Sequence, residues 1–233
     1  MTVQFLVNPC FCAHLFQIAI VTLVANADVV GSAQDMCSDC KSLRTFSGMI
    51  FWHITNASRM FYGCYSLETL TDTLIVCSGT ALNAFQGCIK LKRIDKLVAT
   101  NLAGTFKLCS SLNSIGLVDA SGATGMSEMC YGCAALSDIY VINTESVTNM
   151  NSVFRNCGLL RNIPDMSYAA VTNMNYAFEN MRIASGANAL YTQLSSLANI
   201  SDHTGTFTNC GSSTVAGTAE LAQIPSSWGG TGA

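Results

Sequence analysis

Charged side chains are scarce in this sequence. Asp, Glu, Lys and Arg make up 11% of its residues, whereas ordinary soluble domains carry about 25%. The balance is acidic, with a formal net charge of −3 at pH 7, and the densest basic stretch is IKLKRIDK at 89–96. In this context we interpret that stretch as a solvated strand edge. We therefore expect no nucleic-acid partner, and an outer surface built mainly from uncharged residues.

Motifs for catalysis are also missing. The sequence contains no GxxxxGK[ST], no GxGxxG after a strand and no HExxH. Its three histidines are scattered, so Cys210 with His203 is the one Cys–His pair to consider. Two Cys-x-x-Cys pairs, at 37–40 and 130–133, have zinc-ligand spacing, but the first cysteine of each occupies a slot that holds phenylalanine in other copies of the repeat described below. The sequence predicts no enzyme activity, no metal site and no cofactor.

A repeat runs through most of the chain. VTNMNSVFRNC at 147–157 returns as VTNMNYAFENM at 171–181, with seven of eleven positions identical. Phenylalanine usually stands three residues before the closing position, and Leu or Ile stands three and six residues after it. A unit this short cannot bury its apolar positions alone, so neighbouring units must stack around a shared core. The closing position recurs at intervals of 21 to 29 residues as Cys40, Cys64, Cys88, Cys109, Cys133, Cys157, Met181 and Cys210.

The sequence of each repeat unit predicts two short secondary-structure elements. Met150, Val153, Phe154 and Cys157 follow the i, i+3, i+4, i+7 spacing of one helical stripe, with Thr148 or Asn149 as its cap. The second element alternates apolar and polar residues, as a short strand does. We expect an α/β solenoid of about eight rungs, each a short strand plus a short helical turn, with a cap at either end.

The pattern Met-Phe-x-x-Cys-x-x-Leu-x-x-Leu in MFYGCYSLETL, preceded by VTNM in later copies, resembles the BspA-like class of bacterial-type leucine-rich repeats. The resemblance covers about residues 30–181 well and 203–216 poorly. It implies a surface or secreted protein for adhesion and recognition, without catalysis, and similar repeats also occur in phage-encoded proteins.

The recurring cysteine has three interpretations. A buried free thiol is favoured, because free cysteine packs as a small hydrophobe and a flexible methionine can fill the same gap at Met181. Adjacent rungs could instead place the cysteines within bridging distance in a ladder of disulfides. Zinc binding through the two Cys-x-x-Cys pairs is the third.

The ends differ from the middle. Residues 1–34 contain one charged residue and an AHLFQIAIVTLVANA run that ends like a signal-peptidase site, but no Lys or Arg precedes Lys41. Together with the initiating Met1, this favours a cap or an interface with other subunits over a cleaved signal or a membrane anchor. The predicted division is 1–29 as cap or interface segment, 30–216 as solenoid with an insertion at 182–202, and 217–233 as C-terminal cap and flexible tail.

The predicted binding face is the outward set on the strand side, because solenoids bind partners along such extended faces. We expect a protein or glycan receptor, and a place either on a virion surface, as a phage-type structural or tail component, or on a cell surface as an exported adhesin. The outward pairs form two parallel rows: Arg44 and Thr45, Glu68 and Thr69, Lys92 and Arg93, Asn113 and Ser114, Ser137 and Asp138, Arg161 and Asn162.

Overall fold

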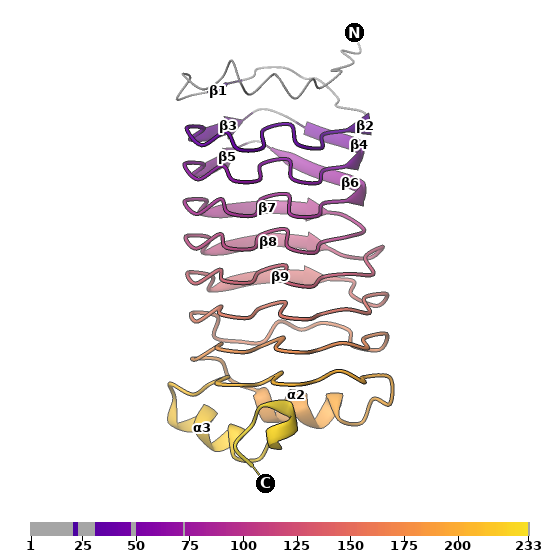
Figure 1. Ribbon diagram of the computed structural model, residues 1–233, viewed down its shortest axis with the longest axis vertical. Coiled ribbons are helices and arrows are strands. Elements are labelled where there is room, and N and C mark those ends of the chain that lie inside the picture. Colours follow the sequence, from indigo (N-terminus) through magenta and orange to yellow (C-terminus); the bar gives the residue numbers. More distant parts are fainter. Residues whose placement is uncertain (1–20, 23–30, 48–49, 72, 233) are drawn as a thin grey trace.

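The chain winds into a parallel β-solenoid whose turns stack along one long axis (Figure 1). The computed structural model describes residues 21–22, 31–47, 50–71 and 73–232. Successive turns follow the order of the sequence from the N-terminal to the C-terminal end. Each turn carries a strand or extended segment on one side and a chain of tight turns on the other.

Every strand pair is parallel. One sheet has the order β1-β3-β5 and the other the order β2-β4-β6-β7-β8-β9. The bounds are β1 Val21–Thr22, β2 Gly31–Ser32, β3 Thr45–Ser47, β4 Ile50–Asn56, β5 Thr69–Thr71, β6 Leu74–Thr80, β7 Arg93–Val98, β8 Ser114–Asp119 and β9 Asp138–Ile142.

Strands occupy only part of the stack. The five strands of five to seven residues, β4, β6, β7, β8 and β9, build about five turns. After Ile142 the ladder continues among the described residues as isolated bridges, such as Asn149 to Asn173 and Asn162 to Ser185. The expected eight rungs, each with a strand and a helical turn, are therefore not confirmed.

The predicted helical turns are wrong, because the residues that form them alternate between two kinds of hydrogen bond. In residues 83–88, the amides of Ala84, Gln86 and Cys88 donate to the carbonyl three residues earlier, and the amides between them donate to the next rung. Positive φ angles at Asn83 and Gly87, 55° and 78°, reverse the right-handed twist that a helix needs. Two such residues, four apart, recur from Asp35 and Asp39 to Gly205 and Asn209.

The helical spacing arose for another reason. In this turn ladder, Ala81, Ala84, Phe85 and Cys88 all point inward and are buried, which reproduces the i, i+3, i+4, i+7 pattern without a helix. The expected cap exists in a modified form, since the side-chain oxygen of Asn149 accepts the amide hydrogen of Asn151 at 2.9 Å within a turn.

A stack of phenylalanines runs through the core. Phe61 and Phe85 lie 5.3 Å apart, centroid to centroid, and Phe85 and Phe106 lie 5.6 Å apart. The stack is interrupted at Cys130 and resumes with Phe154 and Phe178, at 6.3 Å. All of these side chains are buried, so the core is one column shared by successive rungs.

Helices occur at the C-terminal end (Figure 1): α2 spans Ala187–Leu194, α3 spans Val215–Leu221, and the 3-10 helix η1 spans Ser226–Trp228. Trp228 is buried and stacks on Phe207 at 6.3 Å, so it ends the aromatic column. Residues 230–232, in the predicted C-terminal tail, are held by the backbone. The amides of Gly230, Thr231 and Gly232 donate to backbone carbonyls at 3.1, 2.8 and 3.0 Å.

Most of the N-terminal segment lies outside the described residues. Its described part, β1, pairs in parallel with β3, with Val21 opposite Phe46. Whether 1–29 acts as a cap or as an interface with other subunits stays a prediction. None of the helices in the described part of the chain has the length and apolarity that a bilayer span requires.

Candidate binding surface

The outward residues of the strand side form two adjacent rows. In the first, the amide of Glu68 donates to the carbonyl of Arg44, Lys92 to Glu68, Asn113 to Lys92 and Ser137 to Asn113, at 2.8 to 3.2 Å. In the second row, parallel pairing places Thr45 opposite Thr69, Arg93 opposite Ser114, Ser114 opposite Asp138, and Asn162 opposite Ser185.

Charges on these rows are partly paired. Lys92 lies 3.5 Å from Glu68, and Arg93 lies 2.6 Å from Asp95. Among the ion pairs of the described residues, none involves Arg44 or Arg161. Each of these exposed ion pairs stabilises the protein by at most about 1 kcal/mol. A partner can therefore displace them and contact the same side chains.

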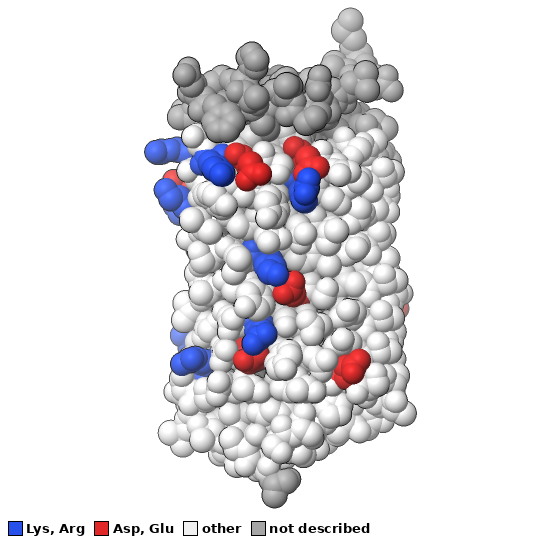
Figure 2. Space-filling model, viewed as in Figure 1, with Lys and Arg blue, Asp and Glu red and all other residues white. Residues whose placement is uncertain are grey.

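Charged residues outside these rows also form ion pairs. Figure 2 shows a face that is mostly uncharged, with blue and red side chains lying side by side. Such pairs include Arg59 with Asp35, at 2.7 Å, and Lys107 with Glu128, at 2.8 Å. The scarcity of charge in the sequence therefore leaves long stretches of neutral surface.

The ladder of the first row breaks after Ser137. In the part of the chain that the structure describes, no strand pairing or backbone hydrogen bond joins β9 to residues 160–166. The ladder resumes one rung later, where the amide of Ser185 donates to the carbonyl of Arg161 at 3.0 Å. Beyond the break, a side chain links the two rungs, because the Thr144 hydroxyl donates to the Ser167 carbonyl and accepts its amide hydrogen.

A groove of about 480 Å³ lies at this break. We name it the β9 groove. Three of the twelve predicted face residues, Ser137, Asp138 and Asn162, line it, and the other nine lie outside it. Its complete lining is Ser137, Asp138, Ile139, Tyr140, Val141, Leu160, Asn162, Ile163, Pro164 and Asp165.

The floor of the groove is apolar core that the sheet no longer covers. Ile94 and Ile115, at the same position in earlier rungs, are 5% and 1% exposed. Their counterparts Ile139 and Ile163 are only partly buried. Tyr140 at the rim is 66% exposed, the highest value among the exposed aromatic residues of the described chain.

A second cavity, of about 380 Å³, adjoins the β9 groove. It shares residues 162–165 with the groove and extends to Tyr168 and α2. Tyr168 is buried, and its hydroxyl donates to the carbonyl of Pro164 at 3.5 Å. Burial, with a smaller contribution from Asp165, raises the pKa of Tyr168 above its usual value, so this hydroxyl stays protonated.

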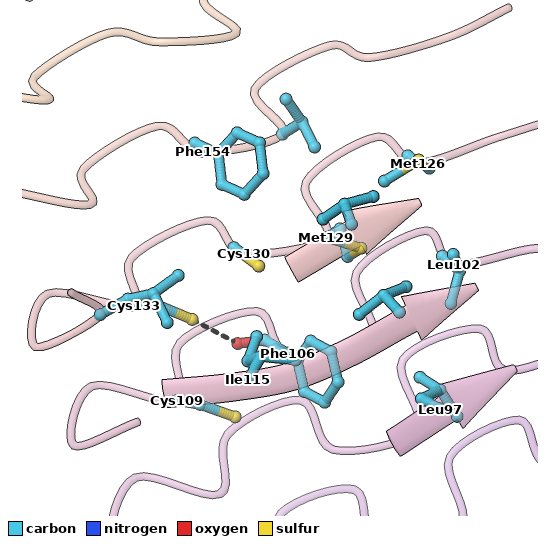
Figure 3. Packing of buried hydrophobic residues seen from close by; sticks show 14 of the residues in the cluster. Leu97, Leu102, Phe106, Cys109, Ile115, Met126, Met129, Cys130, Cys133 and Phe154 are labelled. Atoms are coloured by element: carbon cyan, nitrogen blue, oxygen red, sulfur yellow. Dashed lines mark hydrogen bonds between the residues drawn. The ribbon is translucent and has the colours of Figure 1, made fainter. Parts of the chain in front are cut away.

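The rung cysteines form a second series of contacts between successive rungs, inside the core. Figure 3 shows the thiol of Cys133 directed at the backbone oxygen of Phe106, and the two atoms lie 3.0 Å apart. Cys88, Cys109 and Cys157 repeat this contact with the preceding rung at 3.0 to 3.1 Å. Cysteine thus fills the slot and also donates a weak hydrogen bond.

Cys88, Cys109, Cys133 and Cys157 form no disulfide, and all ten cysteines that the structure describes are buried. Burial, reinforced by the neighbouring thiols of Cys109 and Cys64, raises the pKa of Cys88 well above its usual value. Burial also raises the pKa of Cys130 and Cys157. A protonated, inaccessible thiol is a poor nucleophile and a poor metal ligand.

We expect the rung cysteines to react with a thiol reagent in denaturant without reductant, and to react slowly in the native protein, where they are buried. The reason is that reactivity requires an accessible thiolate. Thiol counting under both conditions checks this. If fewer than about half reacted in denaturant, a bridged ladder stabilised by about 2–4 kcal/mol per bond would replace the free thiols.

The candidate Cys–His pair does not form an activated nucleophile. The imidazole of His203 stacks on Trp228, with ring centroids 4.2 Å apart and planes 2° apart. Burial, with Glu220 as a second cause, raises the pKa of Cys210 to about 12, whereas activation requires a lowered pKa. Among the described residues, no group of three or more His, Cys, Asp or Glu side chains is placed to hold a metal ion.

Comparison with known proteins agrees with a repeat fold. Residues 100–214 match the family described as "Mycoplasma protein of unknown function, DUF285". No curated protein matches the sequence. The fold is similar to the crystal structure of a leucine-rich repeat protein of T. pallidum, with 18% identity, a TM-score of 0.50, and coverage of 77% of this chain and 81% of that chain. The chain is thus a parallel β-solenoid whose fold is similar to that of a leucine-rich repeat protein.

The β9 groove was not predicted from the sequence. One signal was available, because Pro164 is one of only three prolines and falls in the strand part of its rung. Proline has no amide hydrogen and is rare inside sheets. Asn-Ile-Pro-Asp at 162–165 therefore marks the rung at which strand pairing stops.

Proposed function

We propose that this protein recognises a macromolecular partner, protein or glycan, through the strand side of its solenoid and without catalysis. The observation that carries the proposal is the pair of outward rows, which follow strands of both sheets and reach the β9 groove. Extended solenoid faces of this kind commonly bind partners.

The residue types on the rows favour recognition of a polar partner. Arg44 and Arg161 offer guanidinium donors without an internal ion pair among the described residues, and Asn113 and Asn162 are exposed amides that can donate and accept. Side chains repeated at fixed spacing suit a partner that is itself extended or repetitive.

Removing cations from the rows should weaken partner binding. We expect the variant Arg44→Ser/Lys92→Ser/Arg93→Ser to bind at least about threefold more weakly, since each exposed charge contact contributes a few tenths to 1 kcal/mol. The measurement is binding of an immobilised glycan set and of proteins extracted from the source, followed by titration of whichever partner is retained.

The control removes three exposed cations elsewhere: Lys41→Ser/Arg59→Asn/Arg182→Ser. Asparagine is chosen at position 59 because its φ is 54°, a conformation that asparagine tolerates. Equal losses in both variants would reduce the effect to net charge and contradict recognition by the strand side.

The finer family and location are part of the same proposal. The MFYGCYSLETL pattern supports a BspA-like repeat protein. We place it on a virion surface as a phage-type component, and the alternative is an exported bacterial surface adhesin. N-terminal sequencing of native material separates them, because a start at Asp28 supports export and an uncleaved segment supports the virion component.

A further inference from the structure

We propose that the β9 groove binds an extended peptide segment of basic character, which adds to the free edge of β9. This inference rests on the proposed recognition function and names the chemistry of its partner. It starts from a break in an otherwise continuous ladder: β9 pairs with β8 on one side, and no described residue pairs with its other side.

A strand with one free edge presents unpaired amide hydrogens and carbonyl oxygens at regular spacing. An extended peptide satisfies these groups by strand addition, with main-chain hydrogen bonds supplying affinity and side-chain pockets supplying specificity. A glycan offers no such regular alternation of donors and acceptors. The free edge therefore favours a peptide over a sugar.

The floor and rim of the groove add side-chain contacts. Ile139 and Ile163 are only partly buried, whereas Ile94 and Ile115 in the two rungs before β9 are buried. They offer apolar contact to alternate side chains of a bound strand. Tyr140 supplies a largely exposed ring at the rim. Aromatic residues of this kind dominate the energetics of many interfaces.

The charge of the groove indicates the character of the peptide. Asp138 and Asp165 line it and are both exposed, and no Lys or Arg is among its lining residues. Neither carboxylate takes part in an ion pair among the described residues. Complementarity therefore favours lysine or arginine on the peptide.

The test uses an mRNA-displayed library of random dodecapeptides, selected on the full-length protein. We expect enriched sequences that alternate apolar residues and carry net positive charge. The strongest one is then synthesised, and its affinity is measured by fluorescence anisotropy. Failure to enrich any peptide, or enrichment of acidic ones, would overturn the inference.

Two modifications locate the bound peptide. The variant Asp138→Asn/Asp165→Asn should weaken binding about three- to tenfold, as expected for two partly exposed charge contacts. The control Asp39→Asn/Asp202→Asn removes the same charge at exposed sites outside the groove and should bind as the parent does. An equal effect of both variants would contradict binding in the groove.

Main-chain pairing is tested with N-methylated peptides. Methylation of alternate amides removes the donors that face β9 in one register and spares them in the other. We expect one set of methylated peptides to lose at least about tenfold in affinity while the other set binds almost normally. Equal tolerance of both sets would exclude strand addition.

A sugar arm separates the failure of this inference from that of the proposed function. Chitohexaose and maltohexaose are titrated against the protein and against Tyr140→Ala. If the protein bound a saccharide but no peptide, and Tyr140→Ala lost the saccharide, the peptide proposal would be overturned. The proposed recognition by the strand side would still stand. Partner binding that is insensitive to the row variant described above would overturn the proposed function itself.

Discussion

Replacement of Phe154 by alanine is expected to lower the free energy of unfolding by about 3–5 kcal/mol, the usual cost of truncating a fully buried phenylalanine. The ring is 0% exposed and stacks on Phe178 alone among the aromatic pairs of the described chain, at 6.3 Å. Its neighbour on the other side is the small Cys130, as Figure 3 shows. Little nearby bulk can therefore move into the cavity, which places the cost near the upper end.

The matched control is Leu159→Ala in the same rung. Leu159 is 52% exposed, so its truncation should change stability by no more than about 0.5 kcal/mol. Urea unfolding of both variants gives the comparison. A loss below about 1 kcal/mol for Phe154→Ala would mean that the ring does not belong to the shared aromatic column.

Deletion of residues 2–29 is expected to give insoluble or aggregated protein. The segment holds at least nine large apolar side chains and one charge, and burial of each such side chain is worth about 1.5–3 kcal/mol. The deletion also removes β1, which pairs with β3 in the first turn. An uncovered solenoid end exposes both core and strand edge to other chains.

A cleavable version of the N-terminal segment allows it to be removed after the protein has folded. A protease site placed after residue 29 allows the intact protein to be purified first, and uncut protein serves as the control. Cleavage and removal of the segment should cause aggregation, followed by light scattering. If the cut protein stayed monomeric and as thermally stable as before, the segment would be a dispensable leader, which would favour the exported adhesin.

The sequence predicted the stacking because stacking depends on apolar periodicity. The recurring Phe, Cys and Leu positions identified the inward side of every turn correctly, and the Ile139-Tyr140-Val141 alternation identified β9. The predicted helical turn of each unit was wrong, because a helix and a ladder of tight turns give the same apolar periodicity. The difference depends on positive φ at residues such as Asn83 and Glu128, and only some of these are asparagine or glycine.

The outward rows of the candidate site could be predicted from the sequence, and the β9 groove could not. Its rows follow from the outward positions of the repeat, and pairing such as that of Ser114 with Asp138 agrees with them. The β9 groove depends on a missing interaction between two rungs that have similar sequences. Pro164 was the one local sign, and its consequence appears only when neighbouring rungs are placed side by side.

The most direct test of partner recognition by the strand side is amide hydrogen exchange of the full chain, with and without its captured partner. We predict slower exchange on binding in residues 137–142 and 161–165, with no change in the turn segments 83–88 and 128–133. Exchange that slowed in those turn segments, and stayed unchanged in β9 and across the groove, would contradict it.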